Sequence, residues 1–192
     1  MLALAKQMIQ SDRAMRRAER NWTRWDYKGH ELTGRTVGIV GLGNVGRRVA
    51  ELSKAFNMQA IAYDPYITDE DFRERGADKV NSLDELFQSA DIISVNCPLT
   101  DETRGMIGAE QYALMKSSGI FITTARGFIH DETALTAAIA DGEIHLQLSI
   151  LPEGRYVKIR IQHVNGCVNC QVLGLHFTWA LGLHTNRSIF FP

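Results

Sequence analysis

Three glycines between an apolar run and a helical pattern constrain the fold of this chain most strongly. Residues 36–40 are rich in β-branched apolar side chains, which is typical of a buried strand. Gly41, Gly43 and Gly46 follow at the spacing G-x-G-x-x-G, and apolar side chains then recur at helical spacing from Val49. The glycines therefore fall where a strand turns into a helix.

Each glycine has a separate physical role in such a turn. We expect Gly41 to allow the tight turn, Gly43 to let a pyrophosphate approach the backbone, and Gly46 to let helix and strand pack closely. The N-terminus of the helix adds unpaired N–H groups and the positive end of its dipole, which favour phosphate. The sequence therefore predicts a dinucleotide-binding turn.

A carboxylate follows the turn at the distance that such a site requires. Asp64 ends a second apolar run, 60–63, and lies 18 residues beyond Gly46, near the ~20-residue offset of the ribose-binding acid. It would accept hydrogen bonds from the ribose hydroxyls and repel a 2′-phosphate, which favours NAD over NADP. The alternative interpretation is a turn residue at a strand end, before Pro65.

Composition limits the class of protein. The 192 residues carry a net charge of −1, so no nucleic-acid partner is expected. No apolar run reaches the ~18–20 residues of a membrane span, and Lys6 interrupts the only candidate leader, so no membrane partner is expected either. Three cysteines give no plausible disulfide framework, which favours a reduced, cytoplasmic protein.

Strand and helix patterns alternate as far as residue 140. Beyond the first unit, strands are predicted at 77–80, 92–95 and 120–122, and helices at 69–75, 83–89, 110–116 and 132–140. This alternation predicts an α/β fold, a doubly wound parallel (Rossmann) sheet with helices on both faces. Ligands bind such sheets at the carboxyl ends of the strands. Gly41, Asp64 and residues 96–100 and 123–126 all follow predicted strand ends.

Local signals predict where several helices begin and end. Residues 2–20 are predicted to form one amphipathic helix ahead of the first strand. Residues 82–85 have the sequence of a capping box, and Asp131 is a candidate N-cap. Gly76 and Gly119 are candidate glycine ends of the helices before them.

From residue 1 to about 145, the chain resembles the cofactor-binding domain of the NAD-dependent D-isomer-specific 2-hydroxyacid dehydrogenases, a family that includes phosphoglycerate dehydrogenases. The matching motifs are residues 2–6, 34–43, 97–100 with Thr103, and 125–127. The resemblance implies NAD as cofactor and hydride transfer between NAD(H) and the C2 of a small 2-hydroxy or 2-oxo acid.

The resemblance also implies roles for individual residues. The implied cofactor site consists of Gly41, Gly43, Asn44, Val45, Gly46, Asp64, Cys97, Pro98, Thr103, Thr124, Ala125 and Arg126. In it, Asn44 and Val45 give backbone N–H groups to the pyrophosphate. Cys97 and Pro98 flank the adenosine, and Thr103 lies near the phosphates. The residues before Arg126 border the nicotinamide.

Arg126 is the implied catalytic residue. In the family an arginine in this motif grips the carboxylate and carbonyl of the 2-oxo acid and polarises the carbonyl for hydride attack. The alternative is a surface arginine after a strand. His130 is discounted as an acid or base, because its position opens the next helix in the family. No metal site is predicted.

The likeness stops near residue 145. The Gly-Leu-Asp-Val strand, the Glu and the Pro-His pair of the family are not recognisable beyond it, and residues 146–192 hold only five of the 43 charged side chains. We therefore divide the chain into an N-terminal helix and linker (1–33), an NAD-binding Rossmann domain (34–145) and an atypical tail (146–192). A frameshift near residue 145 is the leading explanation, and natural replacement is the alternative.

The tail carries two patterns of its own. Apolar side chains alternate along residues 146–150 and 157–161, which predicts a β-hairpin. Cys167 and Cys170 form a C-x-x-C pair, but no second pair stands at zinc spacing, so a metal or redox role is not favoured.

Three functional hypotheses remain open. The first is the NAD-binding domain of an oxidoreductase, inactive or nearly so by itself because the family Glu and His are missing. The second is an NAD sensor or corepressor-like module without catalysis, and the third is a product that keeps only the fold. By analogy with the family, the N-terminal helix suggests a homodimer.

Overall fold

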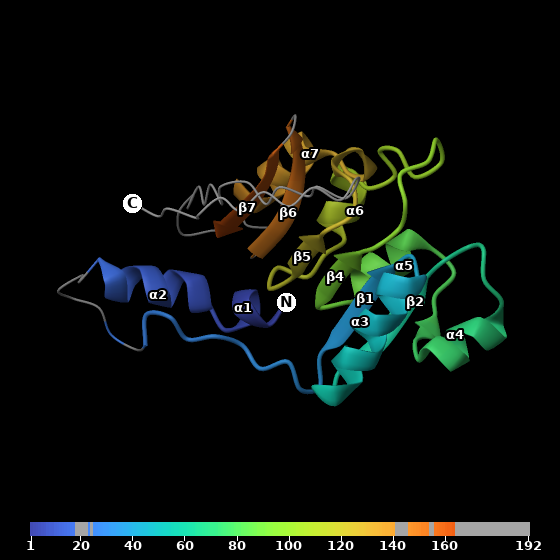
Figure 1. The fold of residues 1–192 in the computed structure, drawn as a ribbon, viewed down its shortest axis with the longest axis horizontal. Helices are drawn as coiled ribbons and strands as arrows, with labels where there is room; N and C mark the ends of the chain where they lie inside the picture. The colour runs from blue at the N-terminus through green and yellow to red at the C-terminus, as the bar shows by residue number, and fades with distance from the viewer. Residues whose placement is uncertain (18–22, 24, 141–145, 154–155, 164–192) are drawn as a thin grey trace, which may run out of the picture.

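The computed structural model describes residues 1–17, 23, 25–140, 146–153 and 156–163. These residues form one sheet in the order β3-β2-β1-β4-β5-β6-β7 (Figure 1). Its strands are β1 (Thr36–Val40), β2 (Gln59–Tyr63), β3 (Asp78–Lys79), β4 (Ile92–Val95), β5 (Ile120–Thr123), β6 (Leu146–Glu153) and β7 (Tyr156–His163). All neighbours pair in parallel except β6 and β7, which are antiparallel. The predicted α/β fold is confirmed.

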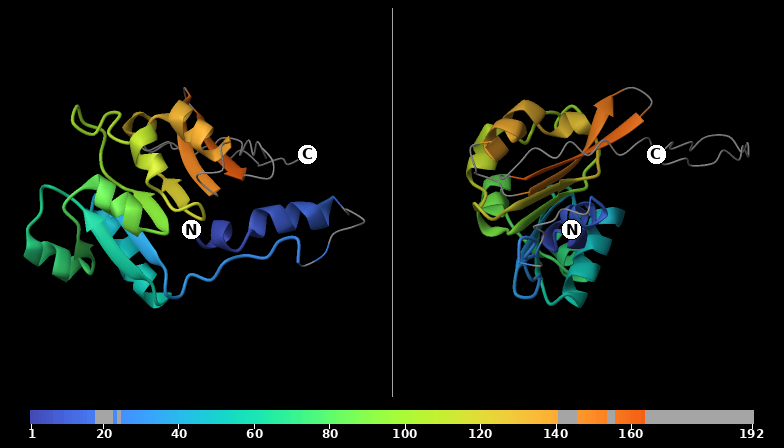
Figure 2. Two further views of the ribbon diagram at one scale, coloured as in Figure 1. Left: turned by 180° about the vertical axis from the view of Figure 1, so that it is seen from behind. Right: turned by 90° about the vertical axis from the view of Figure 1, so that its left-hand side faces the viewer.

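Helices cover both faces of the sheet (Figure 2). They are α1 (Leu2–Ala5), α2 (Met8–Arg16), α3 (Asn44–Ala55), α4 (Asp69–Arg75), α5 (Leu83–Ser89), α6 (Ala109–Ala113) and α7 (Glu132–Ala140), with a 3₁₀ turn, η1, at Gly127–Ile129. Buried side chains of α1, α3 and α4 share one apolar cluster, and those of α5, α6 and α7 share the other. The sheet therefore lies between two layers of helices.

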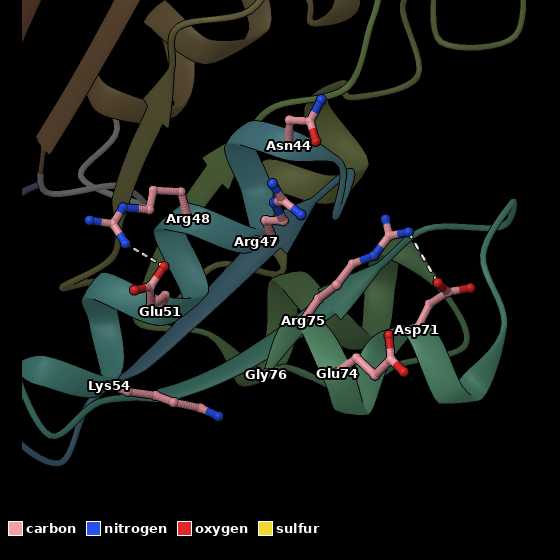
Figure 3. A pocket seen from close by; sticks show the side chains of 9 residues that line it. All are labelled: Asn44, Arg47, Arg48, Glu51, Lys54, Asp71, Glu74, Arg75 and Gly76. Carbon is pink, nitrogen blue, oxygen red and sulfur yellow. Dashed lines mark hydrogen bonds and ion pairs between the residues drawn. The ribbon is translucent and has the colours of Figure 1, made fainter.

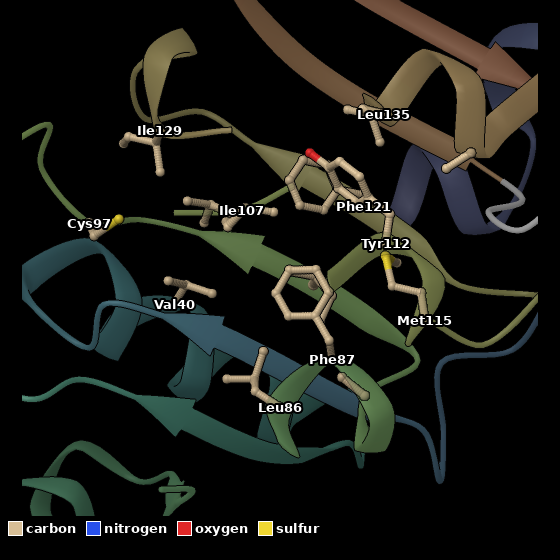
Figure 4. Packing of buried hydrophobic residues seen from close by; sticks show 14 of the residues in the cluster. Val40, Leu86, Phe87, Cys97, Ile107, Tyr112, Met115, Phe121, Ile129 and Leu135 are labelled. Carbon is tan, nitrogen blue, oxygen red and sulfur yellow. The ribbon is translucent and has the colours of Figure 1, made fainter. Parts of the chain in front are cut away.

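Successive residues of a strand belong to the two apolar clusters on opposite faces of the sheet. Val37 and Ile39 of β1 belong to the cluster beneath α3, whereas Val40 belongs to the cluster beneath α5–α7, as the period-2 geometry of a strand requires. Figure 4 shows the second cluster, in which Tyr112 of α6 meets Phe121 of β5 edge-on, with ring centroids 5.4 Å apart. Burying the Phe121 side chain stabilises the fold by roughly 1.5–3 kcal/mol, whereas the buried Tyr112 hydroxyl has no hydrogen-bond partner among the described residues, which offsets part of the gain from its ring.

The N-terminal segment differs from the single helix predicted over residues 2–20. Two helices form instead, α1 and α2, because Gln7 between them has a left-handed backbone, with φ 49°, and a left-handed residue ends an α-helix. Leu4 and Ala5 are buried against the domain, while α2 extends away from the sheet (Figures 1 and 2). Residues 18–20 lie outside the described residues.

Two predicted helix ends are confirmed. Gly76 closes α4 with φ 78°, a conformation that glycine adopts without strain. Asp131 caps α7, because its Oδ1 accepts the N–H groups of Thr133 at 2.8 Å and Ala134 at 3.0 Å.

Of two other predictions of helix ends, one is wrong and one is confirmed in part. The helix predicted to reach residue 116 ends at Ala113, because the N–H of Met115 bonds to the residue three positions back and tightens the last turn. Gly119 is therefore not its closing residue. The capping box at α5 is only half made: Ser82 accepts the Glu85 N–H, but the Glu85 carboxylate accepts the N–H of Asn81.

Strands β6 and β7 extend the sheet beyond β5. They pair antiparallel from Leu146 opposite His163 to Glu153 opposite Tyr156, as the alternating pattern predicts. Cys167 and Cys170 lie outside the described residues. Among the described helices, none is long and apolar enough to cross a membrane.

Candidate functional site

A cavity of about 680 Å³ opens at the carboxyl ends of β1, β2 and β4. The chain passes from β1 to β2 on one side and returns to β4 on the other, so the strand order reverses here, where doubly wound sheets bind their ligands. Six of the predicted cofactor residues line the cavity: Gly41, Gly43, Asp64, Cys97, Pro98 and Thr103.

The three glycines of the turn have different environments. Gly41 has φ 86°, and a Cβ there would lie 2.9 Å from the backbone of Cys97. A Cβ on Gly46 would lie 2.2 Å from the carbonyl oxygen of Gly41, so no side chain fits between helix and strand. A Cβ on Gly43 would meet no atom of the described residues within 4 Å. Packing inside the protein therefore explains Gly41 and Gly46, whereas the open space beside Gly43 fits an approaching pyrophosphate.

The first turn of α3 is open to an anion. Its N-cap is Gly43, which offers no side chain to the terminal N–H groups, and its first turn contains no acidic residue. The predicted pyrophosphate donors Asn44 and Val45 are the first residues of this helix, and both are exposed. Uncapped N–H groups at the positive end of the helix dipole attract phosphate.

Asp64 is held at the end of β2 by two backbone hydrogen bonds. Its Oδ2 accepts the N–H of Leu42 at 3.0 Å, and its Oδ1 accepts the N–H of Tyr66 at 3.1 Å. The carboxylate therefore joins the end of β2 to the glycine turn. Each carboxylate oxygen keeps a second lone pair, so Asp64 can also accept hydroxyl groups from a ligand in the cavity.

The segment after β4 forms the opposite wall of the cavity. The Thr103 hydroxyl donates to the carbonyl of Pro98 at 2.7 Å and accepts the N–H of Thr100 at 2.8 Å, which closes the loop on itself. Cys97 is buried, and burial raises the pKa of its thiol to about 11, with a smaller contribution from the negative charge of Asp64. The thiol therefore stays neutral and serves as an apolar wall.

The cavity also has lining residues that the sequence reasoning missed. The clearest are Tyr66 and Glu102, whose hydroxyl and carboxylate form a hydrogen bond between the loops after β2 and β4. Both follow predicted strand ends by a few residues. That position was the available signal, since the loops after neighbouring parallel strands meet at one edge of the sheet.

The predicted residues Thr124, Ala125 and Arg126 follow β5 and are not among those that line the cavity. Thr124 and Arg126 are exposed. Among the described residues, the Arg126 guanidinium has one long hydrogen bond, 3.5 Å to the carbonyl of Ala125, which leaves most of its donors available to a ligand.

His130 lies in the core and not in the site. Its ring is 5% exposed and packs on Phe121, with ring centroids 5.6 Å apart. Burial lowers the pKa of the imidazole, and the nearby Asp131 opposes this only in part. A neutral ring enclosed in the core cannot exchange a proton with a substrate on the surface loops, which agrees with its exclusion on sequence grounds.

Comparison with known proteins gives one consistent result. The family described as "D-isomer specific 2-hydroxyacid dehydrogenase, NAD binding domain" matches residues 1–148. D-3-phosphoglycerate dehydrogenase of Methanocaldococcus jannaschii is 44% identical over 144 residues, and glyoxylate reductase of Aeropyrum pernix is 40% identical over 148. The crystal structure of the NAD-complexed D-isomer specific 2-hydroxyacid dehydrogenase from Lactobacillus delbrueckii ssp. bulgaricus aligns with a TM-score of 0.69 at 31% identity.

These matches cover most of this chain but only part of each relative. They span 75% of the chain and 27% of the Methanocaldococcus enzyme, and 74% of the chain and 44% of the Aeropyrum enzyme. For the Lactobacillus structure the shares are 80% and 46%. The chain thus spans from about a quarter to just under half the length of these relatives.

Proposed function

Because the chain belongs to the D-isomer specific 2-hydroxyacid dehydrogenase family and matches its NAD-binding domain, we propose that it holds the cofactor of a 2-hydroxyacid oxidoreductase. Such an enzyme moves a hydride between NAD(H) and the C2 of a small 2-hydroxy or 2-oxo acid. The observation that carries the proposal is the cavity at the reversal of strand order, which both Gly43 and Asp64 line.

We propose that the cofactor is held by Gly41, Gly43, Asn44, Val45, Gly46, Asp64, Cys97, Pro98, Thr103, Thr124, Ala125 and Arg126. The α3 N-terminus and the space beside Gly43 suit the pyrophosphate. The lone pairs that remain on Asp64 suit the hydroxyls of the adenosine ribose, and its negative charge disfavours a 2′-phosphate. When bound, the nicotinamide supplies or accepts the hydride.

Arg126 would act on the substrate. A planar guanidinium binds a carboxylate through two parallel hydrogen bonds, and the same positive charge polarises a neighbouring carbonyl. Its exposure and its single long hydrogen bond support this role. Arg126 would then fix the orientation of the 2-oxo acid and stabilise the negative charge that develops on its oxygen during hydride attack.

We further propose that the chain by itself turns over slowly or not at all. The Glu and the Pro-His pair of the family are not recognisable in residues 146–192, and a general acid or base contributes about 10²–10⁴-fold to such a rate. NADH oxidation with glyoxylate, hydroxypyruvate and phosphohydroxypyruvate tests this. Turnover barely above background is expected, and robust turnover with any of the three acids would contradict it.

NAD sensing without catalysis is the second candidate function. One observation favours it: the uncapped α3 N-terminus and Asp64 suit cofactor binding, whereas the ring of His130, the histidine nearest to Arg126 in the sequence, is enclosed in the core. Saturable NAD binding with no turnover on the three acids agrees with both candidate functions and excludes a product that keeps only the fold, which would not bind NAD, whereas robust turnover would exclude a sensor without catalysis.

The division of the chain into residues 1–33, 34–145 and 146–192 is proposed on the family likeness, although β6 continues the sheet past residue 145. We also propose a homodimer formed through α1 and α2, since Leu2, Met8 and Met15 are exposed there. Sedimentation velocity would detect it, and a single monomer species at high concentration would contradict it.

A further inference from the structure

We propose that Arg75 of α4 is a positioning residue for the phosphate-binding turn, an inference that rests on the proposed NAD site. Its Nη1 donates to the carbonyl oxygen of Leu42 at 2.8 Å, and its Nη2 donates to Oδ1 of Asp71 at 3.1 Å. Leu42 is the residue between Gly41 and Gly43. Figure 3 shows Arg75 extending from α4, with its guanidinium beside Asp71.

Arg75 and Asp64 together fix both peptide groups that flank Leu42. Asp64 accepts the N–H of Leu42, which belongs to the peptide shared with Gly41. Arg75 binds the carbonyl of Leu42, which belongs to the peptide shared with Gly43. In a planar trans peptide the C=O and N–H point in opposite directions, so fixing this carbonyl also fixes the direction of the Gly43 N–H. That N–H belongs to the glycine beside which a pyrophosphate has room.

Arg75 is itself held in place. Its side chain and that of Asp71 are each about 30% exposed, at 29% and 33%. The other oxygen of Asp71 accepts the N–H and the hydroxyl of Thr68 in the capping box of α4. The guanidinium therefore bridges the first turn of α4 and the glycine turn. A lysine ammonium lacks the planar fork of donors that makes this bridge.

Loss of this bridge should affect the ligand more than the fold. Arg75 lines a groove of about 690 Å³ between α3 and α4. Because the groove is wide enough for water, water can replace the guanidinium at the Leu42 carbonyl when the side chain is shortened. The carbonyl then stays hydrogen-bonded while the turn gains freedom, which a ligand must restrict again on binding.

The test compares Arg75→Met and Arg75→Lys with Arg73→Met, which changes an exposed arginine of the same helix. NADH and adenosine are titrated into each variant at low salt and at about 1 M salt, where the Debye length is only ~3 Å. The melting temperature is recorded for each variant without ligand. Adenosine carries no phosphate, so it reports on the rest of the site.

We expect Arg75→Met to raise the Kd for NADH about tenfold at both salt concentrations, because the ligand must then restrict a turn that Arg75 no longer holds. Arg75→Lys should lose most of the same affinity, although it keeps the charge. Adenosine affinity, the melting temperature and the Arg73→Met control should stay close to wild type.

Failure of the inference and failure of the proposed function have different signatures. If the wild type does not bind NADH, the proposed NAD site is wrong. If the wild type binds but Arg75→Met binds equally well, only the positioning role is wrong. A loss that disappears in high salt and is absent in Arg75→Lys would indicate a simple charge effect and overturn the inference, as would an equal loss of adenosine affinity.

Discussion

At the scale of single residues, Gly43 and Gly46 are glycines for different reasons. A methyl group on Gly46 would overlap the Gly41 carbonyl oxygen at 2.2 Å, whereas one on Gly43 would meet no atom of the described residues within 4 Å. Gly46→Ala should therefore lower the free energy of unfolding by about 1–3 kcal/mol. Gly43→Ala should cost less, up to about 1 kcal/mol, because alanine is less favourable than glycine at an N-cap, and it should still weaken NAD binding. Urea unfolding and NAD titration of both variants check this pair.

Two results for Gly43→Ala would contradict this prediction. A strongly destabilised Gly43→Ala would mean that the turn needs glycine for its own conformation. Unchanged NAD affinity in a folded Gly43→Ala would mean that no phosphate approaches this position.

The buried ring of His130 should make stability depend on pH. Burial lowers the pKa of the imidazole in the folded state below the ordinary value of ~6.5. About one unit or more above pH 6.5, both states are neutral at this site and it contributes no pH dependence. As the pH falls below 6.5, the unfolded chain binds the proton first, so stability falls, by at most about 1.4 kcal/mol per pH unit for one proton.

His130→Leu should remove this part of the acid sensitivity. The measurement is the free energy of unfolding in urea from pH 7.5 to 5.0 for the wild type and the variant. The difference between the two curves should change below pH ~6.5. Parallel curves over the whole range would show that His130 is protonated equally in both states.

The conformation and packing of single residues could be predicted where a fixed spacing in the sequence determines the local backbone geometry. The spacing G-x-G-x-x-G predicted the conformation of Gly41 and the close packing at Gly46, because both depend on a turn of fixed length. The contact between Arg75 and Leu42 was not predictable, because the two residues are 33 positions apart and meet only through the packing of α4. The hydrogen bond between Asp64 and the N–H of Leu42 was missed for the same reason.

At the scale of elements, the N-cap of α7 is a local feature that can be tested alone. Asp131 accepts two N–H groups of the first turn. Asp131→Ala should lower the free energy of unfolding by about 1 kcal/mol, while Asp131→Asn keeps a side-chain oxygen and should cost much less. Thermal unfolding of the two variants makes the comparison. Equal destabilisation by both would indicate that the charge matters more than the cap.

Periodicity predicted the existence of the helices better than their ends. The apolar pattern at the start of the chain fits two short helices as well as one long helix. The break between them is a left-handed backbone at Gln7, and the types of the surrounding residues do not indicate it. The early end of α6 depends on a change from i→i+4 to i→i+3 hydrogen bonds. Residue types at Glu110–Lys116 do not encode that change.

At the scale of the whole molecule, the alternation of strands and helices was enough to predict the sheet and the edge that carries the site. It was not enough to place Arg126 relative to the cavity. Asp64 follows β2 and Cys97 follows β4, and both of these strands are neighbours of β1. Arg126 follows β5, which lies one strand farther from the reversal of strand order. How the nicotinamide end of the site is completed therefore depends on loop conformations that strand order does not specify.

Calorimetric titration of NAD and NADP can establish whether the cavity beside Gly43 and Asp64 is an NAD site. We expect the wild type to bind NAD at least about tenfold more tightly than NADP, a difference of ~1.4 kcal/mol. Asp64→Asn, with its fold checked by urea unfolding, should bind NAD about tenfold more weakly and lose most of that preference. A wild type that does not bind NAD, or a folded Asp64→Asn that binds both nucleotides as the wild type does, would contradict the claim.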